Sequence, residues 1–418
     1  MVRACPAFAL LLLAAPLRAD VLVVDASNGP GTDFTSLQAA ADAAASGDML
    51  LVRSGDYGGL LIDGKSLSVV ADAGADVSVA FTAPMQMTEL RNLAPGQTVL
   101  LQGLSLRAIP AMPTFFTYNG CFVHDCAGTV WLDDCVVEFG APALRVQDCA
   151  RVIVAGGSIL GALSVESDAG AGLQVEDSNV VVAGSSVLGG DGRDAGWGAF
   201  MTFIGSSAGA PGVSQSGPGS VVTLADCTVH GGAGGSGFWF FGHNCGAPSD
   251  GGDGLVLAAE FGPVARLAGT MPLGGASGGS TQCGQTSSPG LGVHTLGGSV
   301  MFLSGVPATL TAAGPAREGE SLAVDIHGKA GDLAWVVLST MPGGKFLYSK
   351  QGELLLDPPF TAVTLGPLPA GGGLALTAHV PELGPGVEGL VAWAQVVTCG
   401  AGCVMGTGSA LVLLDAGL

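Results

Sequence analysis

This chain has little charge of either sign, and basic residues are the scarcest. Of its 418 residues, 14 are Lys or Arg and 34 are Asp or Glu, which leaves a net charge of −20 at pH 7. Nucleic acids and anionic membranes attract basic surfaces, so neither is expected as a partner. After its first residues the sequence also lacks an unbroken apolar run long enough to cross a bilayer, so membrane insertion is not expected.

Helical periodicity is nearly absent as well. One Ala-rich segment at residues 31–47 shows it, while the remaining chain consists of short apolar runs separated by Gly, Asp and Pro. The 70 Gly and the 11% of charged residues fit short strands and tight turns. The sequence therefore predicts an all-β protein with one small helix near its N-terminus.

Residues 1–19 have the features of a secretory signal peptide. Arg3 supplies a positive start, an apolar stretch runs from Phe8 to Ala15, and Ala19 precedes the expected cleavage point. The apolar stretch is too short to span a membrane. We therefore expect an exported protein, either secreted and extracellular or held at the cell surface.

Short β-rich runs recur along the chain with spacers of variable length. Each run is an apolar stretch, a small or polar break and a second apolar pair, and three of them follow a shorter module that reads V-x-D-C or V-x-D-S. A constant element with variable spacers indicates a solenoid of parallel strands, in which equivalent positions of successive coils stack. The runs begin at Val99, Val130, Val152, Val180 and Val222, and the shorter modules begin at Val123, Val146 and Val175.

This alignment also predicts which residues stack at the corners of the coils. Small side chains at a corner let the backbone turn tightly while they face the core. One stack is expected to contain Cys126, Cys149 and Ser178, and another Cys135, Gly157, Ser185 and Cys227. We interpret residues 20–306 as a right-handed parallel β-helix.

The single predicted helix is expected to cap the N-terminal end of such a solenoid. Its first coil is an open edge that pairs with other chains unless a cap covers it. Thr35 and Gln38 have the spacing of a capping box, and Gly47 stands where the helix is expected to end. The predicted buried face consists of Leu37, Ala41 and Ala44, at helical spacing.

The same segment carries a resemblance to a known superfamily. The string "GTDFTSLQAAADAAASGD" resembles the N-terminal segment of secreted right-handed β-helix proteins of the pectin lyase-like superfamily, in which G-D-F-T-x-x-Q-A-A is common. The repeats extend the resemblance to about Val306. It implies a β-helix fold, but the superfamily includes lyases, esterases, hydrolases, phage tailspikes and surface proteins without known activity.

The C-terminal part of the chain follows another pattern. Residues 307–418 contain seven candidate strands separated by turns rich in Pro and Gly. Seven short strands in a segment of this length predict a small antiparallel β-sandwich. It resembles, loosely, the C-terminal sandwich modules of secreted bacterial proteins.

The catalytic motifs of the superfamily are missing. The D-F-I-F-G and Q-D-T strings of pectin methylesterases are absent, and Asp133-Asp134 is the sole match to the motifs of polygalacturonases. The clustered Asp and Arg of pectate lyases cannot be assembled either. A chain with a net charge of −20 also repels polyuronates, so pectin is disfavoured while a neutral polysaccharide stays open.

Two acidic strings are candidate catalytic or calcium-binding sites. Asp133 and Asp134 could serve as a general acid and base, but neighbours on a strand point in opposite directions, which favours a solvated turn. The string "GGDGRDAGW" at Gly189 matches most of a calcium-binding nonapeptide, yet it occurs once and Gly196 stands where a large apolar residue is needed. We therefore expect no metal and no other cofactor.

The long spacers leave their coils at about the same point. Because equivalent points stack, these loops are expected to crowd one side of the solenoid, and they hold most of its aromatic residues. Aromatic rings on loops of a rigid scaffold can stack on sugars, although they can equally form a local core under the loops. The candidate ligand-binding residues are Trp197, Phe200, Phe203, Phe238, Trp239 and Phe240.

Export makes disulfides possible. Cys245 and Cys283 lie in Gly-rich spacers of neighbouring coils and are predicted to form one, and Cys399 and Cys403 are predicted to form another across the sequence "CGAGC". The cysteines at corner positions are expected to be mostly buried thiols, with a bridge between Cys126 and Cys149 left open.

The sequence thus favours a noncatalytic extracellular binding or surface-structural protein, with neutral glycans as candidate ligands. It is expected to be a monomer. The alternative is a divergent polysaccharide hydrolase or lyase that acts on an extracellular glycan. A cleft lined by two or three carboxylates would favour the enzyme, and an aromatic patch without them would favour binding.

Overall fold

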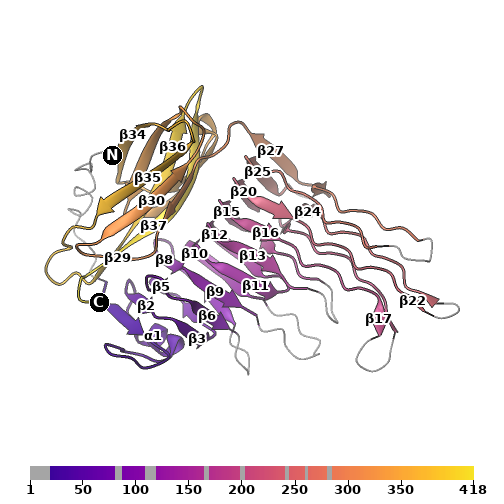
Figure 1. Cartoon of the computed structure of the whole chain (residues 1–418), viewed down its shortest axis with the longest axis horizontal. Helices are drawn as coiled ribbons and strands as arrows, with labels where there is room; N and C mark the ends of the chain where they lie inside the picture. Colours follow the sequence, from indigo (N-terminus) through magenta and orange to yellow (C-terminus); the bar gives the residue numbers. More distant parts are fainter. Residues whose placement is uncertain are drawn as a thin grey trace.

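A computed structural model of the chain describes residues 19–80, 87–108, 119–163, 169–197, 203–240, 244–258, 262–279 and 285–418. Nearly all regular structure in them is β, and the body is a parallel β-helix with an antiparallel module along its side (Figure 1). Within this part of the chain no helix combines the length and the apolar character needed to cross a bilayer. Most of the predicted signal peptide, residues 1–18, lies outside the described residues.

The coils of the β-helix contribute strands to three parallel ladders. The first ladder contains β4 (Leu61–Asp63), β7 (Thr88–Arg91), the start of β10 (Cys121–Asp133) and of β12 (Leu144–Ala155), β14 (Leu173–Glu176), β19 (Val213–Ser216), β24 (Leu255–Ala258) and β26 (Val293–Thr295). The second contains β1 (Val21–Val24), β2 (Met49–Val52), β5 (Leu67–Ala71), β8 (Thr98–Gln102), the ends of β10 and β12, β15 (Asn179–Ala183), β20 (Val221–Ala225), β25 (Val264–Ala268) and β27 (Ser299–Leu303). The third contains β3 (Gly55–Gly58), β6 (Val77–Ala80), β9 (Leu104–Arg107), β11 (Val136–Gly140), β13 (Ser158–Gly161), β16 (Ser186–Leu188) and β21 (Thr228–His230).

The repeat alignment made from the sequence is confirmed residue by residue. Val130 pairs in register with Val99 on one side and with Val152 on the other, and the ladder continues through Val180 to Val222. Val123, Val146 and Val175 stack in the same way in the first ladder. All these side chains belong to one buried hydrophobic cluster that fills the β-helix.

The V-x-D modules form one corner of the coils. Asp125, Asp148 and Asp177 have positive φ angles of 54°, 52° and 44°, in the left-handed region that Asp tolerates better than most residues. The next residues stack as predicted, since Cys126 lies opposite Cys149 and the Cys149 N–H donates to Ser178 Oγ at 2.9 Å.

The second predicted corner stack is also present. The N–H groups that follow each corner donate to the corner carbonyl of the preceding coil: Ser158 to Cys135 at 3.0 Å, Ser186 to Gly157 at 3.2 Å and Thr228 to Ser185 at 3.1 Å. A Cβ added at Gly157 would lie 2.1 Å from the Cys135 carbonyl oxygen. This corner therefore requires glycine in that coil.

The N-terminal helix α1 (Leu37–Ala43) covers the first coil, as predicted. Leu37, Ala40, Ala41 and Ala44 are buried and belong to the core cluster of the β-helix. The predicted capping box is wrong. The N-cap is Ser36, whose side chain accepts from the Ala39 N–H, so the cap lies one residue beyond Thr35.

The rest of the expected helix terminus differs too. The Gln38 side chain is bonded to Asp42 and to the Leu61 backbone, so it does not reach back to the cap. The helix ends at Ala43, and the expected terminator Gly47 lies in the following turn with φ 106°. The side chain that the local motif would have used is therefore bonded to the backbone of Leu61 in the first ladder.

Replacing Leu37 with Lys should release this cap. A helix of seven residues is not stable alone, and removing a buried Leu side chain costs about 2–5 kcal/mol. The exposed first coil should then associate with other chains, which light scattering would detect as a rise in mass. Ala39→Lys, on the exposed face of the same helix, is the matched control; equal behaviour of the two variants would show that α1 is not a cap.

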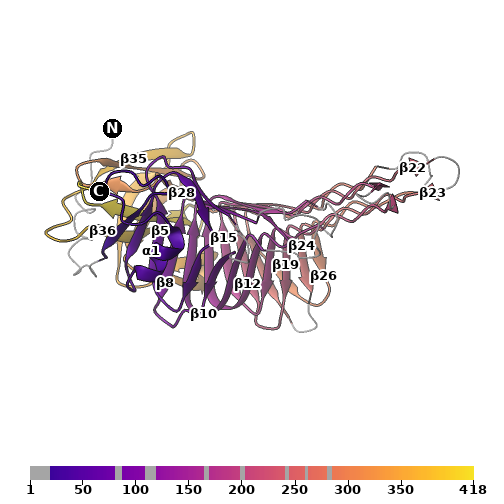
Figure 2. The ribbon, with the colours of Figure 1, turned by 90° about the horizontal axis from the view of Figure 1, so that it is seen from below.

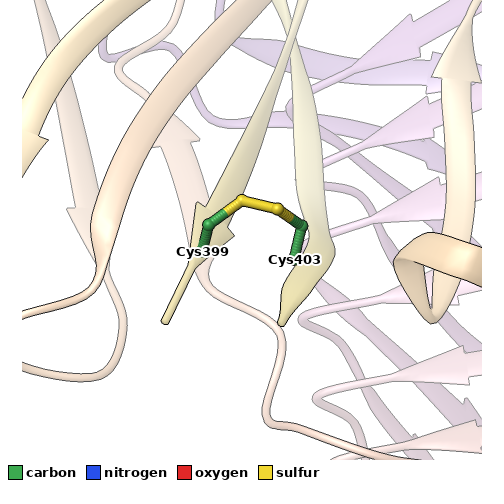
Figure 3. The surroundings of a disulfide bond; sticks show 2 residues. All are labelled: Cys399 and Cys403. Atoms are coloured by element: carbon green, nitrogen blue, oxygen red, sulfur yellow. A yellow bond between two sulfur atoms is a disulfide. The ribbon is translucent and has the colours of Figure 1, made fainter. Parts of the chain in front are cut away.

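The C-terminal module consists of mostly antiparallel sheets, and many of its buried side chains share one cluster. Its Cys399–Cys403 disulfide, predicted from the sequence, joins the ends of the last two strands (Figure 3). The elements are β28 (Thr309–Ala312), β29 (Ala316–Arg317), β30 (Ser321–His327), β31 (Leu333–Ser339), β32 (Pro342–Leu347), the 3-10 helix η2 (Tyr348–Lys350), β33 (Gly352–Leu356), β34 (Phe360–Pro367), β35 (Gly373–His379), β36 (Gly389–Cys399) and β37 (Cys403–Leu414).

A second hydrophobic cluster joins this module to the β-helix. The second ladder alternates inward and outward side chains, and the outward ones pack on strands β33, β36 and β37. Trp131 and Trp393 meet here, with ring centroids 6.4 Å apart. The β-helix contributes Val21, Met49, Leu51, Val70, Leu100, Trp131, Ile153, Ala155 and Val181, and the module contributes Leu355, Leu356, Trp393, Ala410, Val412 and Leu414.

Candidate functional site

Glycine-rich loops project from one side of the β-helix and run together to a distant end (Figure 2). They leave after β16, β21 and β25, so the prediction that long spacers crowd one side is confirmed for them; the spacer that follows Leu106 lies largely outside the described residues. We call these loops the glycine arm. Its outgoing segments are 189–195, 231–238 and 271–279, and its returning segments are 205–212, 246–254 and 285–292.

Hydrogen bonds between the outgoing segments recur at every third residue. In the first pair the N–H groups of Gly189, Gly192 and Ala195 donate to the carbonyls of His230, Ala233 and Ser236 at 2.9, 2.7 and 2.9 Å. The second pair repeats this spacing, with Gly231, Gly234 and Gly237 donating to Leu273, Ala276 and Gly279. A three-residue repeat is that of the polyproline II helix, which has three residues per turn and no internal hydrogen bonds.

The returning segments form a second layer against the outgoing ones. Gly232 donates to Ala210 at 2.8 Å and Gly235 donates to Ser207 at 3.0 Å, so the two chains run in opposite directions. The same three-residue step joins the third outgoing segment to the second returning segment, where Gly275 donates to Gly252 at 2.7 Å and Gly278 donates to Ser249 at 3.0 Å. The arm is therefore a two-layer bundle of extended chains, held by main-chain hydrogen bonds.

The spacing of glycine in the arm follows from this packing. A Cβ added at Gly235 would lie 1.7 Å from the Arg193 carbonyl oxygen, and one at Gly190 would lie 1.8 Å from the Ala162 carbonyl oxygen. Chains that approach so closely leave no room for a side chain, and so glycine recurs every third residue, as at Gly231, Gly234 and Gly237. The three-residue period of glycine is present in the sequence and is a signal from which this close packing could be predicted.

The aspartates of the arm complete its hydrogen bonding. Asp191 and Asp194 accept from the N–H groups of Ala233 and Ser236, at 2.7 and 2.6 Å. Asp250 and Asp253 do the same for Ser288 and Leu291, both at 2.6 Å. The string that resembles a calcium-binding nonapeptide thus places its two carboxylates on backbone donors of the next coil. Among the described residues no group of three or more His, Cys, Asp or Glu side chains is arranged to hold a metal ion.

The outer end of the arm carries the predicted aromatic residues. The hairpin of β17 (Gly196–Trp197) and β18 (Phe203–Ile204) places Trp197 opposite Phe203. The hairpin of β22 (Trp239–Phe240) and β23 (Asn244–Cys245) places Trp239 opposite Cys245 and Phe240 opposite Asn244. Phe238, next to β22, is 39% exposed.

The two hairpins belong to neighbouring loops of the arm, as the bond between Ala195 and Ser236 shows. The structure therefore brings Trp197, Phe203, Phe238, Trp239 and Phe240 to one end of the arm (Figures 1 and 2). Phe200 lies outside the described residues.

The predicted bond between Cys245 and Cys283 stays a prediction, because Cys283 lies outside the described residues. Its premise is supported, since the Gly237 N–H donates to the Gly279 carbonyl at 3.1 Å and makes the second and third loops neighbours. Cys126, Cys135, Cys149 and Cys227 are free and buried, as expected for thiols at corner positions, and Cys121 is free and buried as well. Cys126 and Cys149 are among them, so the bridge left open between them is not formed.

Asp133 and Asp134, the acidic pair at the end of β10, have structural roles. Asp134 forms a corner with φ 48°, while Asp133 is 3% exposed and points at the C-terminal module. Asp133 Oδ2 accepts from Gln102 Nε2 at 2.8 Å, Ala410 N at 2.9 Å and Ser409 Oγ at 3.0 Å. Burial raises the pKa of Asp133 to about 7 against the effect of these bonds, but no substrate can reach the group.

The other cluster of titratable side chains lies on the outer face of the first ladder. His124 Nε2 is 2.9 Å from Glu89 Oε1, His124 Nδ1 is 2.7 Å from Asp125 Oδ2, and Arg91 bonds both Glu89 and Asp63. Burial lowers the pKa of His124, but the hydrogen bonds to Glu89 and Asp125 outweigh it and leave the pKa above its ordinary value. Each carboxylate in this cluster is already paired, which is the arrangement of a surface ion-pair network.

No family model matches the chain, and no curated protein matches it. Among solved structures, the chain is similar to full-length tailspike protein 2 from Escherichia coli O157:H7 bacteriophage CAB120, at 11% identity and a TM-score of 0.31, over 96% of this chain and 69% of that one.

Proposed function

We propose that this protein is a noncatalytic extracellular binding protein that recognises neutral glycans through the aromatic end of the glycine arm. The observation that carries the proposal is the arm itself, a two-layer bundle that ends in two hairpins with Trp197, Phe203, Trp239 and Phe240. Aromatic rings offer apolar faces on which sugar rings stack, and sites on loops held by a rigid scaffold are favoured for binding.

The construction of the arm supports this role. Main-chain hydrogen bonds and glycine packing hold the segments over the whole described length of the arm, so the hairpins need not bury aromatic rings to keep the chains together. Preorganised loops lose less conformational entropy on binding than disordered ones. A binding end held away from the β-helix also reaches ligands that the body would exclude.

The charge of the arm supports a neutral ligand. The described arm segments contain the carboxylates Asp191, Asp194, Asp250 and Asp253, and Arg193 is the one Lys or Arg in those segments. The whole chain has a net charge of −20. Acidic polysaccharides are repelled by such a surface. The proposal includes export, which the N-terminal residues predict.

Trp197→Ala and Trp239→Ala should each weaken glycan binding. Loss of one stacking ring is worth about 0.5–1.5 kcal/mol, which is roughly a tenfold rise in Kd at the upper end. A glycan array on the full exported chain would identify a neutral ligand, and titration calorimetry would measure the two variants. Phe360→Ala, at a 51% exposed ring of the C-terminal module, is the control and should bind like wild type.

Two results would contradict the proposal. A large fall in Tm for both Trp variants, with no specific loss of binding, would mean that these rings form a local core under the loops. Release of new reducing ends from a bound glycan by the wild-type protein would replace the binding function with the hydrolase or lyase alternative.

A further inference from the structure

The two ends of the β-helix differ in how they are closed. At the first coil, α1 covers the core with Leu37, Ala40 and Ala41. At the last coil, β26 pairs with β24 and β27 pairs with β25, and within the described residues no strand takes up their other edges. The last coil therefore presents unpaired backbone donors and acceptors, which are a template for another strand.

The last coil also exposes side chains at core positions. One inward stack of the second ladder runs through Leu132, Val154, Val182, Leu224, Leu267 and Phe302 in register. Leu267 is 2% exposed, whereas Phe302, one coil further on, is 63% exposed. Leu291, Leu296 and Val306, which also follow β25 in the chain, are exposed as well. The core of the β-helix is thus open at this end.

Protective charge is missing from the same end. No Asp, Glu, Lys or Arg occurs in residues 267–316, although the chain has 34 acidic residues. Monomeric β-proteins protect exposed edges with charges, proline, bulges or covering segments. Here β27, whose sequence is SVMFL, has none of these within the described residues.

The occupant that fits this end is a second copy of the chain. Two copies with a net charge of −20 each repel one another, and the uncharged end is the part of the described surface where that repulsion is least. A basic partner would instead be drawn to the acidic surfaces. Because α1 closes the first coil, head-to-tail stacking is blocked, so two last coils must face one another.

We propose that two copies of this chain associate through their last coils, with β27 of each copy pairing antiparallel across a two-fold axis. Such an isologous contact closes on itself and gives a dimer rather than a filament. It buries Phe302 and pairs the free edges of β27. The dimer differs from the monomer expected from the sequence, and it displays two glycine arms, which would raise avidity for repeated ligands.

Sedimentation velocity of the full exported chain over a range of concentrations tests this directly. We expect a wild-type mass about twice that of one chain and a monomer for Phe302→Lys, whose dimer Kd should rise at least about 100-fold. Phe360→Lys, which changes an exposed Phe far from the last coil on the module strand β34, is the matched control and should stay dimeric.

Hydrogen exchange then locates the interface. The amides of β27 should be protected in wild type and in Phe360→Lys, and should exchange faster in Phe302→Lys, while the Tm of the monomeric variant stays within a few degrees of that of wild type. A wild-type monomer at about 100 μM, or a Phe302→Lys variant that still dimerises, would overturn the proposal. Because the single-site Kd for glycan does not depend on dimerisation, these outcomes are independent of the proposed function.

Discussion

Gly278→Ala should unfold the outer part of the glycine arm, while Gly279→Ala, one residue further on, should leave it intact. A Cβ at residue 278 would lie 2.0 Å from the Gly235 carbonyl oxygen. Main-chain hydrogen bonds hold both segments in place, so the two segments cannot move apart to make room for it. At residue 279 the nearest atom is Ser236 Oγ at 3.6 Å, an ordinary contact. Overpacking of this kind costs about 3 kcal/mol.

Hydrogen exchange of the arm amides measures this difference. In Gly278→Ala we expect fast exchange at Gly235 and Gly278 and loss of glycan binding, with little change in the global Tm because the arm shares no residue with the core of the β-helix. Gly279→Ala should behave like wild type in all three measurements. Equal protection in the two variants would show that the chains do not pack as closely as described.

Asp133→Asn should make the protein more stable than wild type above neutral pH. Burial raises the pKa of Asp133 to about 7 in the folded state, against roughly 3.9 for an unfolded Asp. A raised pKa means that the stability contributed by the protonated group is fully present below the unfolded pKa and is lost as the pH rises through about 7. At about 1.36 kcal/mol per pKa unit, the loss is on the order of 4 kcal/mol by pH 8.

Asn keeps an oxygen acceptor for Gln102, Ser409 and Ala410 and cannot ionise. Urea unfolding at pH 4.5 and at pH 8 should therefore show a fall in the free energy of unfolding for wild type that is absent in Asp133→Asn. Asp325→Asn, at an exposed position of β30, should retain the wild-type difference between the two pH values. A variant at residue 133 with the full wild-type pH dependence would mean that another group is responsible.

The repeats, the corner residues and the presence of the capping helix were predictable because they depend on short-range patterns. The spacing between the Val residues that begin successive repeats predicts which residues stack, and it predicts the observed register of Val99, Val130 and Val152. The Cys399–Cys403 disulfide could be predicted because just three residues, Gly400, Ala401 and Gly402, lie between the two cysteines. The exact helix cap was missed by one residue, since Gln38 bonds Leu61 across the coil.

The glycine arm could be located from the sequence but its structure could not be derived. Extended segments of this type have no internal hydrogen bonds. Local sequence therefore does not predict which other segment each of them pairs with. Gly189 finds its partner at His230, and Gly232 finds its partner at Ala210. Glycine at every third residue indicates such a bundle only when neighbouring coils bring several of these segments together.

The sequence by itself determined a β-helix with a covered first coil, a separate C-terminal strand pattern, and aromatic residues grouped in long spacers. Tertiary structure alone decided the rest. Asp133 became a buried contact because Ser409 and Ala410, far along the chain, supply its donors, and Phe302 became exposed because no further coil covers it. Local sequence states which side chains face inward, but burial depends on whether another part of the chain lies against them.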